Sequence, residues 1–116
     1  MKTIEILAGE RIKLNVNISS GANVGSNVSL DDKMIKKSHT NNFTVDLGLI
    51  NDIDGQVLSV VSNFFVAGGN IDAIMETTHV LNIISPETTP PEIEASKVKI
   101  SPTLFMAYVV IKFKII

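Results

Sequence analysis

The fold of this chain is decided by residues 11–19, RIKLNVNIS, in which apolar and polar side chains alternate without a break. Alternation with a period of two is the pattern of a β-strand that has one face in a core and the other in water. Ile12, Leu14, Val16 and Ile18 supply the core face. No helical pattern of ten residues or more accompanies this strand, so we predict an all-β protein built around it.

Working outward, the same alternation and several β-branched runs predict the other strands. They cover residues 3–7, 43–47, 56–66, 71–75, 79–84, 97–100 and 104–116. Residues 28–30 fit a short strand or loop, and residues 31–42 fit a loop or a single helical turn. About eight strands separated by Gly-, Asn- and Pro-rich turns are typical of an antiparallel β-sandwich.

The length of 116 residues predicts a single domain over residues 1–116. Residues 85–92 contain three prolines, which cannot donate to a sheet, so we predict a loop there that can act as a hinge for the final strands. The predicted core is formed by Ile12, Leu14, Val16, Phe43, Val45, Val57, Val60, Leu81, Val98, Phe105, Val109, Ile111 and Phe113.

The opening residues 4–16, IEILAGERIKLNV, resemble the first hairpin of bacterial and phage immunoglobulin-like modules, in which such a turn joins a short strand to a long alternating one. Residues 43–48 and 54–61 are similar to the middle strands of those modules. The resemblance implies an immunoglobulin-like sandwich. The core Cys pair and Trp of antibody-type domains are absent, so it extends to architecture alone and leaves the function open.

Composition excludes several classes of protein. Hydrophobic residues make up 45% of the chain and charged residues 19%, against about 25% charged in ordinary soluble domains. The chain has no Cys, so disulfides, thiolate metal sites and cysteine nucleophiles are excluded. A net charge of −2 with Arg11 as the sole arginine argues against a nucleic-acid partner. No leader-like or membrane-spanning segment occurs, which favours a virion or a cytoplasmic assembly over membrane insertion.

No pattern of side chains predicts catalysis or a cofactor. Asp52 and Asp54 precede Gly55 in a possible calcium loop, although an Asp-Gly hairpin turn explains the same residues. His39 and His79 lack the further ligands that zinc requires and are expected to be solvated. We therefore expect no catalytic, metal or cofactor-binding residues.

The candidate interaction surface lies near the end of the chain. Lys97, Lys99, Lys112 and Lys114 alternate with apolar residues, and pairing of the last two strands through residues 101–103 would place all four ammonium groups on one face. Such a face attracts an anionic or acidic partner, although alternation of this kind also serves to keep the outside of a strand soluble. The apolar end, Phe113, Ile115 and Ile116, completes its own sheet or augments that of a neighbour.

These observations favour a non-enzymatic structural subunit of a phage virion, a contractile tail or a similar bacterial multi-protein complex. Its expected partners are protein subunits, in a homo-oligomer or a hetero-assembly, held by apolar patches and strand edges. The alternative is a ligand-binding module, such as a glycan-binding or adhesin-like sandwich.

Overall fold

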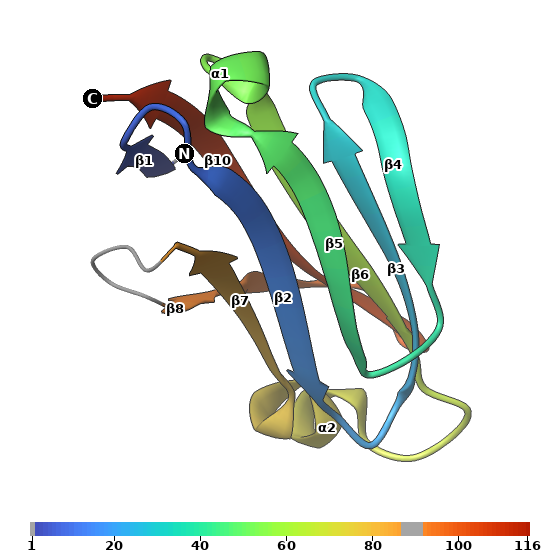
Figure 1. Ribbon diagram of the computed structural model, residues 1–116. Coiled ribbons are helices and arrows are strands. Elements are labelled where there is room, and N and C mark those ends of the chain that lie inside the picture. Colours follow the sequence, from blue (N-terminus) through green and yellow to red (C-terminus); the bar gives the residue numbers. More distant parts are fainter. Residues whose placement is uncertain (1, 87–91) are drawn as a thin grey trace.

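A computed structural model describes residues 2–86 and 92–116, which form ten strands and two short helices. The strands make two sheets that face each other across an apolar core (Figure 1). The prediction of an all-β, two-sheet protein is confirmed. The number of strands in the described residues exceeds the predicted eight.

The larger sheet, sheet A, has six strands in which β10 occupies a central place. Its members are β1 (Lys2–Ile6), β3 (Asn23–Leu30), β4 (Lys33–Ser38), β6 (Val57–Phe65), β9 (Ser96–Ser101) and β10 (Leu104–Ile115). The order across the sheet is β1-β10-β6-β3-β4, and β9 pairs with β10 on the same side as β1. Strand β10 therefore has β6 along one side, and β9 followed by β1 along the other.

The smaller sheet, sheet B, has four strands in the order β5-β2-β7-β8. They are β2 (Arg11–Ser19), β5 (Asn42–Leu49), β7 (His79–Ser85) and β8 (Glu92–Glu94). Strand β2 pairs antiparallel with β5 and β7, so the stretch that decided the fold lies inside its sheet and presents Ile12, Leu14 and Val16 fully buried to the core.

Most of the predicted core residues are buried, and four are not. Val98 is 38% exposed, and Phe43, Val57 and Leu81 are only half-buried. In β6 and β7 the buried side chains are those of Leu58, Val60, Val80 and neighbours at even positions, so Val57 and Leu81 lie on the other face of their strands. A run that is apolar on both faces does not reveal which face is inside.

Residues 71–75 were predicted as a strand, and this prediction is wrong. They belong to helix α2 (Ile71–Thr77), which begins at Asn70. The Asn70 side chain accepts hydrogen bonds from the backbone N–H groups of Asp72 and Ala73, at 3.0 and 3.3 Å. Asn is among the best residues at a helix N-cap, and this cap outweighs the β-type pattern of a short segment.

Two other segments differ from their predictions. Residues 33–38, expected in a loop or helical turn, form the edge strand β4, and β3 begins at Asn23 rather than at residue 28. The predicted Asp-Gly turn near residue 54 follows helix α1 (Ile50–Ile53), with Gly55 at a φ of 79°. Polar edge strands are hard to predict because they bury little apolar surface.

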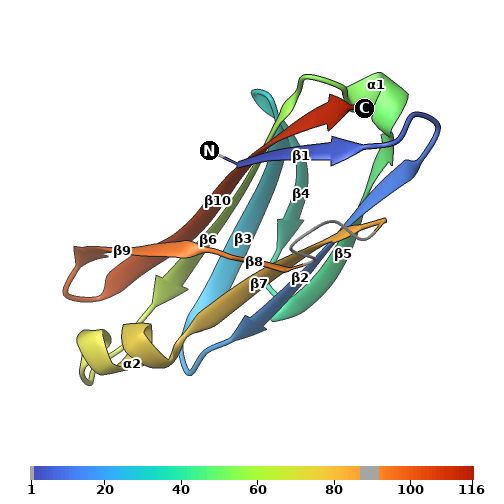
Figure 2. The ribbon, with the colours of Figure 1, turned by 90° about the vertical axis from the view of Figure 1, so that its left-hand side faces the viewer.

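The two ends of the described chain lie side by side in sheet A (Figures 1 and 2). Strand β1 pairs with β10 in parallel, with Ile4 opposite Phe113. The sandwich was predicted to be antiparallel, but sheet A contains this parallel pair. The predicted hinge, residues 85–92, falls mainly on residues 87–91, which lie outside the described residues.

A polar contact fixes the junction of β2 and β5, where the register shifts by a bulge. Arg11 Nε donates to Asp46 Oδ2 and the Gly48 N–H donates to Asp46 Oδ1, both at 2.9 Å. Gly48 has a φ of 96°, a backbone conformation that suits glycine. The Gly48 N–H and the Arg11 guanidinium hold the pKa of Asp46 below its usual value, because both stabilise the carboxylate.

Candidate functional site

The last two strands pair as an antiparallel hairpin, as predicted, but they do not place the four lysines on one face. Lys97 and Lys99 lie opposite Ala107 and Phe105, whose side chains are buried in the core. Paired residues share a face, so Lys97 and Lys99 are directed to the inner side of sheet A. Lys112 and Lys114 alternate with the buried Ile111 and Phe113 and lie on the outer side.

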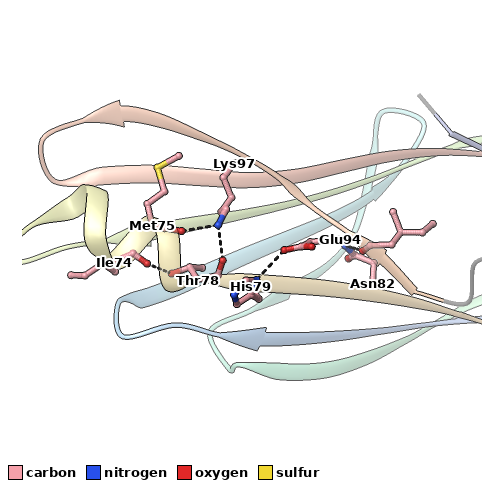
Figure 3. A network of polar contacts seen from close by, with 8 residues as sticks. Ile74, Met75, Thr78, His79, Asn82, Glu94 and Lys97 are labelled. Carbon is pink, nitrogen blue, oxygen red and sulfur yellow. Dashed lines mark hydrogen bonds and ion pairs between the residues drawn. The ribbon is translucent and has the colours of Figure 1, made fainter.

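The inward direction of Lys97 is explained by helix α2, which lies below the β9–β10 hairpin (Figure 2). The Lys97 ammonium donates to the backbone carbonyl oxygens of Met75, at 2.7 Å, and Thr78, at 2.9 Å (Figure 3). The last carbonyls of a helix have no intrahelical donor, and here the Met75 carbonyl accepts from the Thr78 N–H at 3.3 Å and from the charged Lys97. Lys97 therefore joins α2 to sheet A.

Lys99 also turns toward α2, in a weaker and more exposed contact. Its ammonium lies 3.3 Å from Asp72 Oδ1, and both side chains are largely exposed. Exposed ion pairs of this kind contribute about 0–1 kcal/mol to stability. The two lysines at this sheet edge are thus held by the helix and do not cover the outer face.

We expect Lys97→Met to lower the free energy of unfolding by about 1–3 kcal/mol, because it leaves two carbonyls without their charged donor. Lys99→Met is the matched control and should cost less than about 1 kcal/mol. Urea denaturation of both variants measures the difference. Equal losses for the two variants would show that the Lys97 contact does not stabilise the junction.

The three apolar candidates at the end of the chain have different surroundings. Phe113 is fully buried between the sheets, Ile115 packs half-buried against the core, and Ile116 is 59% exposed. The Ile116 N–H donates to the Ile6 carbonyl at 3.1 Å. Strand β10 thus completes the sheet of its own chain, the first of the two expected arrangements.

Because Lys97 and Lys99 are directed inward, the outer side of β9 and of residues 104–110 of β10 carries mainly apolar side chains, and Lys112 and Lys114 lie beyond its end. We call this surface the apolar strip, and its residues are Val61, Val98, Ile100, Leu104, Met106, Tyr108 and Val110. Val98 lies opposite Met106, and Tyr108 lies opposite Val61. Ile100, in the bulge of β9, is 54% exposed, and Tyr108 is 39% exposed. Sequence alone placed Val98 in the core, because only the register reveals its outward direction.

A second polar group lies between β7 and β8. His79 Nδ1 is 3.0 Å from Glu94 Oε1 at the surface, and the hydrogen bond from His79 lowers the pKa of Glu94. Further along, the buried Asn82 donates through Nδ2 to the Ile93 carbonyl at 3.1 Å (Figure 3). Asn82 Oδ1 has no hydrogen-bond partner among the described residues. These contacts join β7 to β8.

The remaining candidates stay apart. Asp54 Oδ1 accepts a hydrogen bond from the Ile115 N–H at 2.8 Å, which gives this carboxylate a role in the fold. Asp52 lies exposed in α1. His39 follows β4 of sheet A, whereas the His79–Glu94 pair joins β7 to β8 in sheet B. Within residues 2–86 and 92–116, no group of three His, Asp or Glu side chains is placed to hold a metal ion.

Comparisons of the chain with protein-family models, with curated protein sequences and with solved structures returned no match. Among the described residues, no helix has the length and apolar character needed to cross a membrane.

Proposed function

We propose that the protein is a non-enzymatic assembly subunit that binds a second copy of itself at strand β9 and the apolar strip. The single observation that carries the proposal is the location of Lys97 and Lys99, which are engaged by α2 and leave an apolar edge and face exposed. Lysines on edge strands normally discourage pairing with other chains. Here the two lysines of the edge strand β9 are directed toward α2.

The backbone of β9 supports edge-to-edge pairing. In the described part of the chain, β10 is the one strand that pairs with β9, so one side of β9 is open (Figure 2). Two copies of β9 in antiparallel alignment would extend sheet A across a two-fold axis, which is the commonest symmetry of homo-oligomers. The alignment brings two apolar strips together on one face.

Charge supports a second copy as the partner. The apolar strip contains no charged residue, and the whole chain carries a net charge of only −2. Two copies therefore meet at this surface without strong repulsion, whereas an acidic or basic partner finds no complementary charge there. Exposed Tyr, Met and branched aliphatic side chains with few charges are typical of the core of a protein–protein interface.

The order of the strands supports an immunoglobulin-like architecture, which we include in the proposal. In the variable-type layout, strands G, F, C and C′ are neighbours in one sheet, and E lies beside B in the other. Strands β10, β6, β3 and β4 follow the first order, and β5 beside β2 follows the second. In that layout strand A lies beside B, whereas here β7 occupies this position. Such modules suit the phage or bacterial assembly that the sequence favours.

Sedimentation velocity over an about tenfold range of concentration tests the proposal. We expect a reversible dimer, and we expect Val98→Glu to weaken it by at least about tenfold by placing charges at the interface. Thr44→Glu is the matched control, since Thr44 is an exposed strand residue on the outer side of sheet B, and it should leave the dimer unchanged. A monomer at every concentration, or an oligomer that tolerates Val98→Glu, would overturn the proposal.

A further inference from the structure

The outer side of sheet A has a second feature, a hollow over β3 beside the apolar strip. It has a volume of about 450 Å³, which falls in the range of small-molecule sites. Strands β3, β4 and β6, which are neighbours in the sheet, supply its lining (Figure 1). Its floor is Gly25, in the strand β3, opposite Asn63 of β6.

The backbone conformation does not explain why residue 25 is a glycine. Its φ is not in the left-handed region, and its register with β6 is regular. A Cβ at this position would lie 3.6 Å from His39 Nδ1, which is an ordinary van der Waals contact. Glycine inside a strand reduces stability and commonly marks the close approach of a ligand. The fold has room for a Cβ here, so packing within the chain does not require glycine at this position.

The walls of the hollow carry hydrogen-bonding groups that the fold does not use. The amides of Asn23 and Asn27 come from β3, and that of Asn63 comes from β6. Within the described residues, none of the three makes a side-chain hydrogen bond, whereas Asn41, Asn70 and Asn82 do. Each free amide presents donors and an acceptor together, which is the pattern that pairs with neighbouring sugar hydroxyl groups.

An aromatic ring and a cation complete the lining. Phe65, at the end of β6, is 58% exposed, so the hollow is flanked by an open apolar ring against which the C–H face of a sugar can pack. Lys37 lies opposite Asn27 across β3 and β4, and the imidazole of His39 lies over Gly25. None of the described residues that line the hollow carries a carboxylate. The local charge therefore favours an anion over a neutral or cationic ligand.

We propose that this hollow binds an acidic saccharide, a sugar residue that carries a carboxylate. In this site Phe65 packs on the sugar ring, the amides of Asn27 and Asn63 bind hydroxyl groups, and Lys37 binds the carboxylate. The site uses residues other than the apolar strip, so it does not depend on self-association.

A panel of immobilised oligosaccharides with uronic-acid or sialic-acid ends, each beside its neutral counterpart, tests the site. We expect wild-type protein to bind acidic members, with affinities confirmed by calorimetry. Gly25→Val should abolish binding, because its methyl groups fill the floor, and it should unfold at the same urea concentration or a higher one. Ser29→Val, on the same face of β3 beyond the hollow, is the matched control and should bind normally.

Lys37→Gln separates the charge from the shape of the site. It should weaken binding of the acidic members by about tenfold and leave the neutral ones unchanged. The proposal is overturned if no acidic member binds, if Gly25→Val binds as well as wild type, or if neutral counterparts bind equally. Val98→Glu should bind saccharide normally, so failure of self-association and failure of this site are distinguishable.

Discussion

Removal of Lys112–Ile116 is expected to leave a chain that does not fold. The deletion removes the fully buried Phe113 and most of the part of β10 that pairs with β1. It also removes the two hydrogen bonds between Phe113 and the segment after α1, the Gly55 N–H to the Phe113 carbonyl at 2.8 Å and the Phe113 N–H to the Gln56 carbonyl at 3.1 Å. Together these losses are comparable with the about 5–15 kcal/mol that stabilise a typical domain.

Circular dichroism and a urea titration of the shortened chain measure this outcome. Phe113→Ala provides a graded version, with an expected loss of about 3–5 kcal/mol for a buried phenylalanine. Lys114→Ala, one position away on the outer side of β10, is the control and should change stability by less than about 0.5 kcal/mol. A shortened chain that keeps a cooperative unfolding transition would contradict the arrangement, and would instead identify these residues as a strand donated to a neighbour.

Among single substitutions that keep the shape of the replaced side chain, Asn82→Asp should cause the largest loss of stability. Asn82 is fully buried, and its Oδ1 already lacks a hydrogen-bond partner among the described residues. A carboxylate there is desolvated with no cation to balance it, at an expected cost of about 3–5 kcal/mol near neutral pH. Burial raises the pKa of such a carboxyl group, so the loss is greatest above that pKa and diminishes as the pH falls through it.

Urea midpoints of the variant and of wild type, compared at the same pH from neutral to about pH 4, measure this effect. The difference between the two urea midpoints should become smaller as the pH falls. Asn15→Asp, in the neighbouring strand β2 but exposed, controls for the change of charge and should shift stability by less than about 0.5 kcal/mol. If the difference between the two urea midpoints did not change with pH, packing rather than charge would be the cause of the lost stability.

The fold could be predicted from sequence wherever one face of a strand is apolar and the other is polar. Strand β2 satisfies this condition along its whole length, and its buried face was predicted correctly. The condition fails at β6 and β7, whose apolar residues occupy both faces, so Val57 and Leu81 were given the wrong direction. It fails again at α2, where one capping side chain, Asn70, decides between helix and strand.

The surfaces depend on register, which the sequence does not contain. The hairpin of β9 and β10 was predicted, but the direction of Lys97 depends on which residue of β10 lies opposite it and on the carbonyls of α2 below. The sequence pattern placed Gly25 in a loop before the predicted strand, and its role at the floor of the hollow depends on Asn63, Lys37 and Phe65, which β6 and β4 bring beside it. The spacing of these residues along the sequence does not reveal that they lie together in the fold.

The central place of β10 in sheet A has a consequence for biosynthesis. Within this domain β1 is made before the other described strands, but β10, the strand with which it pairs, is made after them. Until β10 emerges, β1 and β9 have no partner in the sheet and one side of β6 is open. Contacts between such distant parts of a chain form slowly and leave strand edges exposed meanwhile. The nascent domain is therefore expected to need protection by a holding chaperone until β10 has emerged.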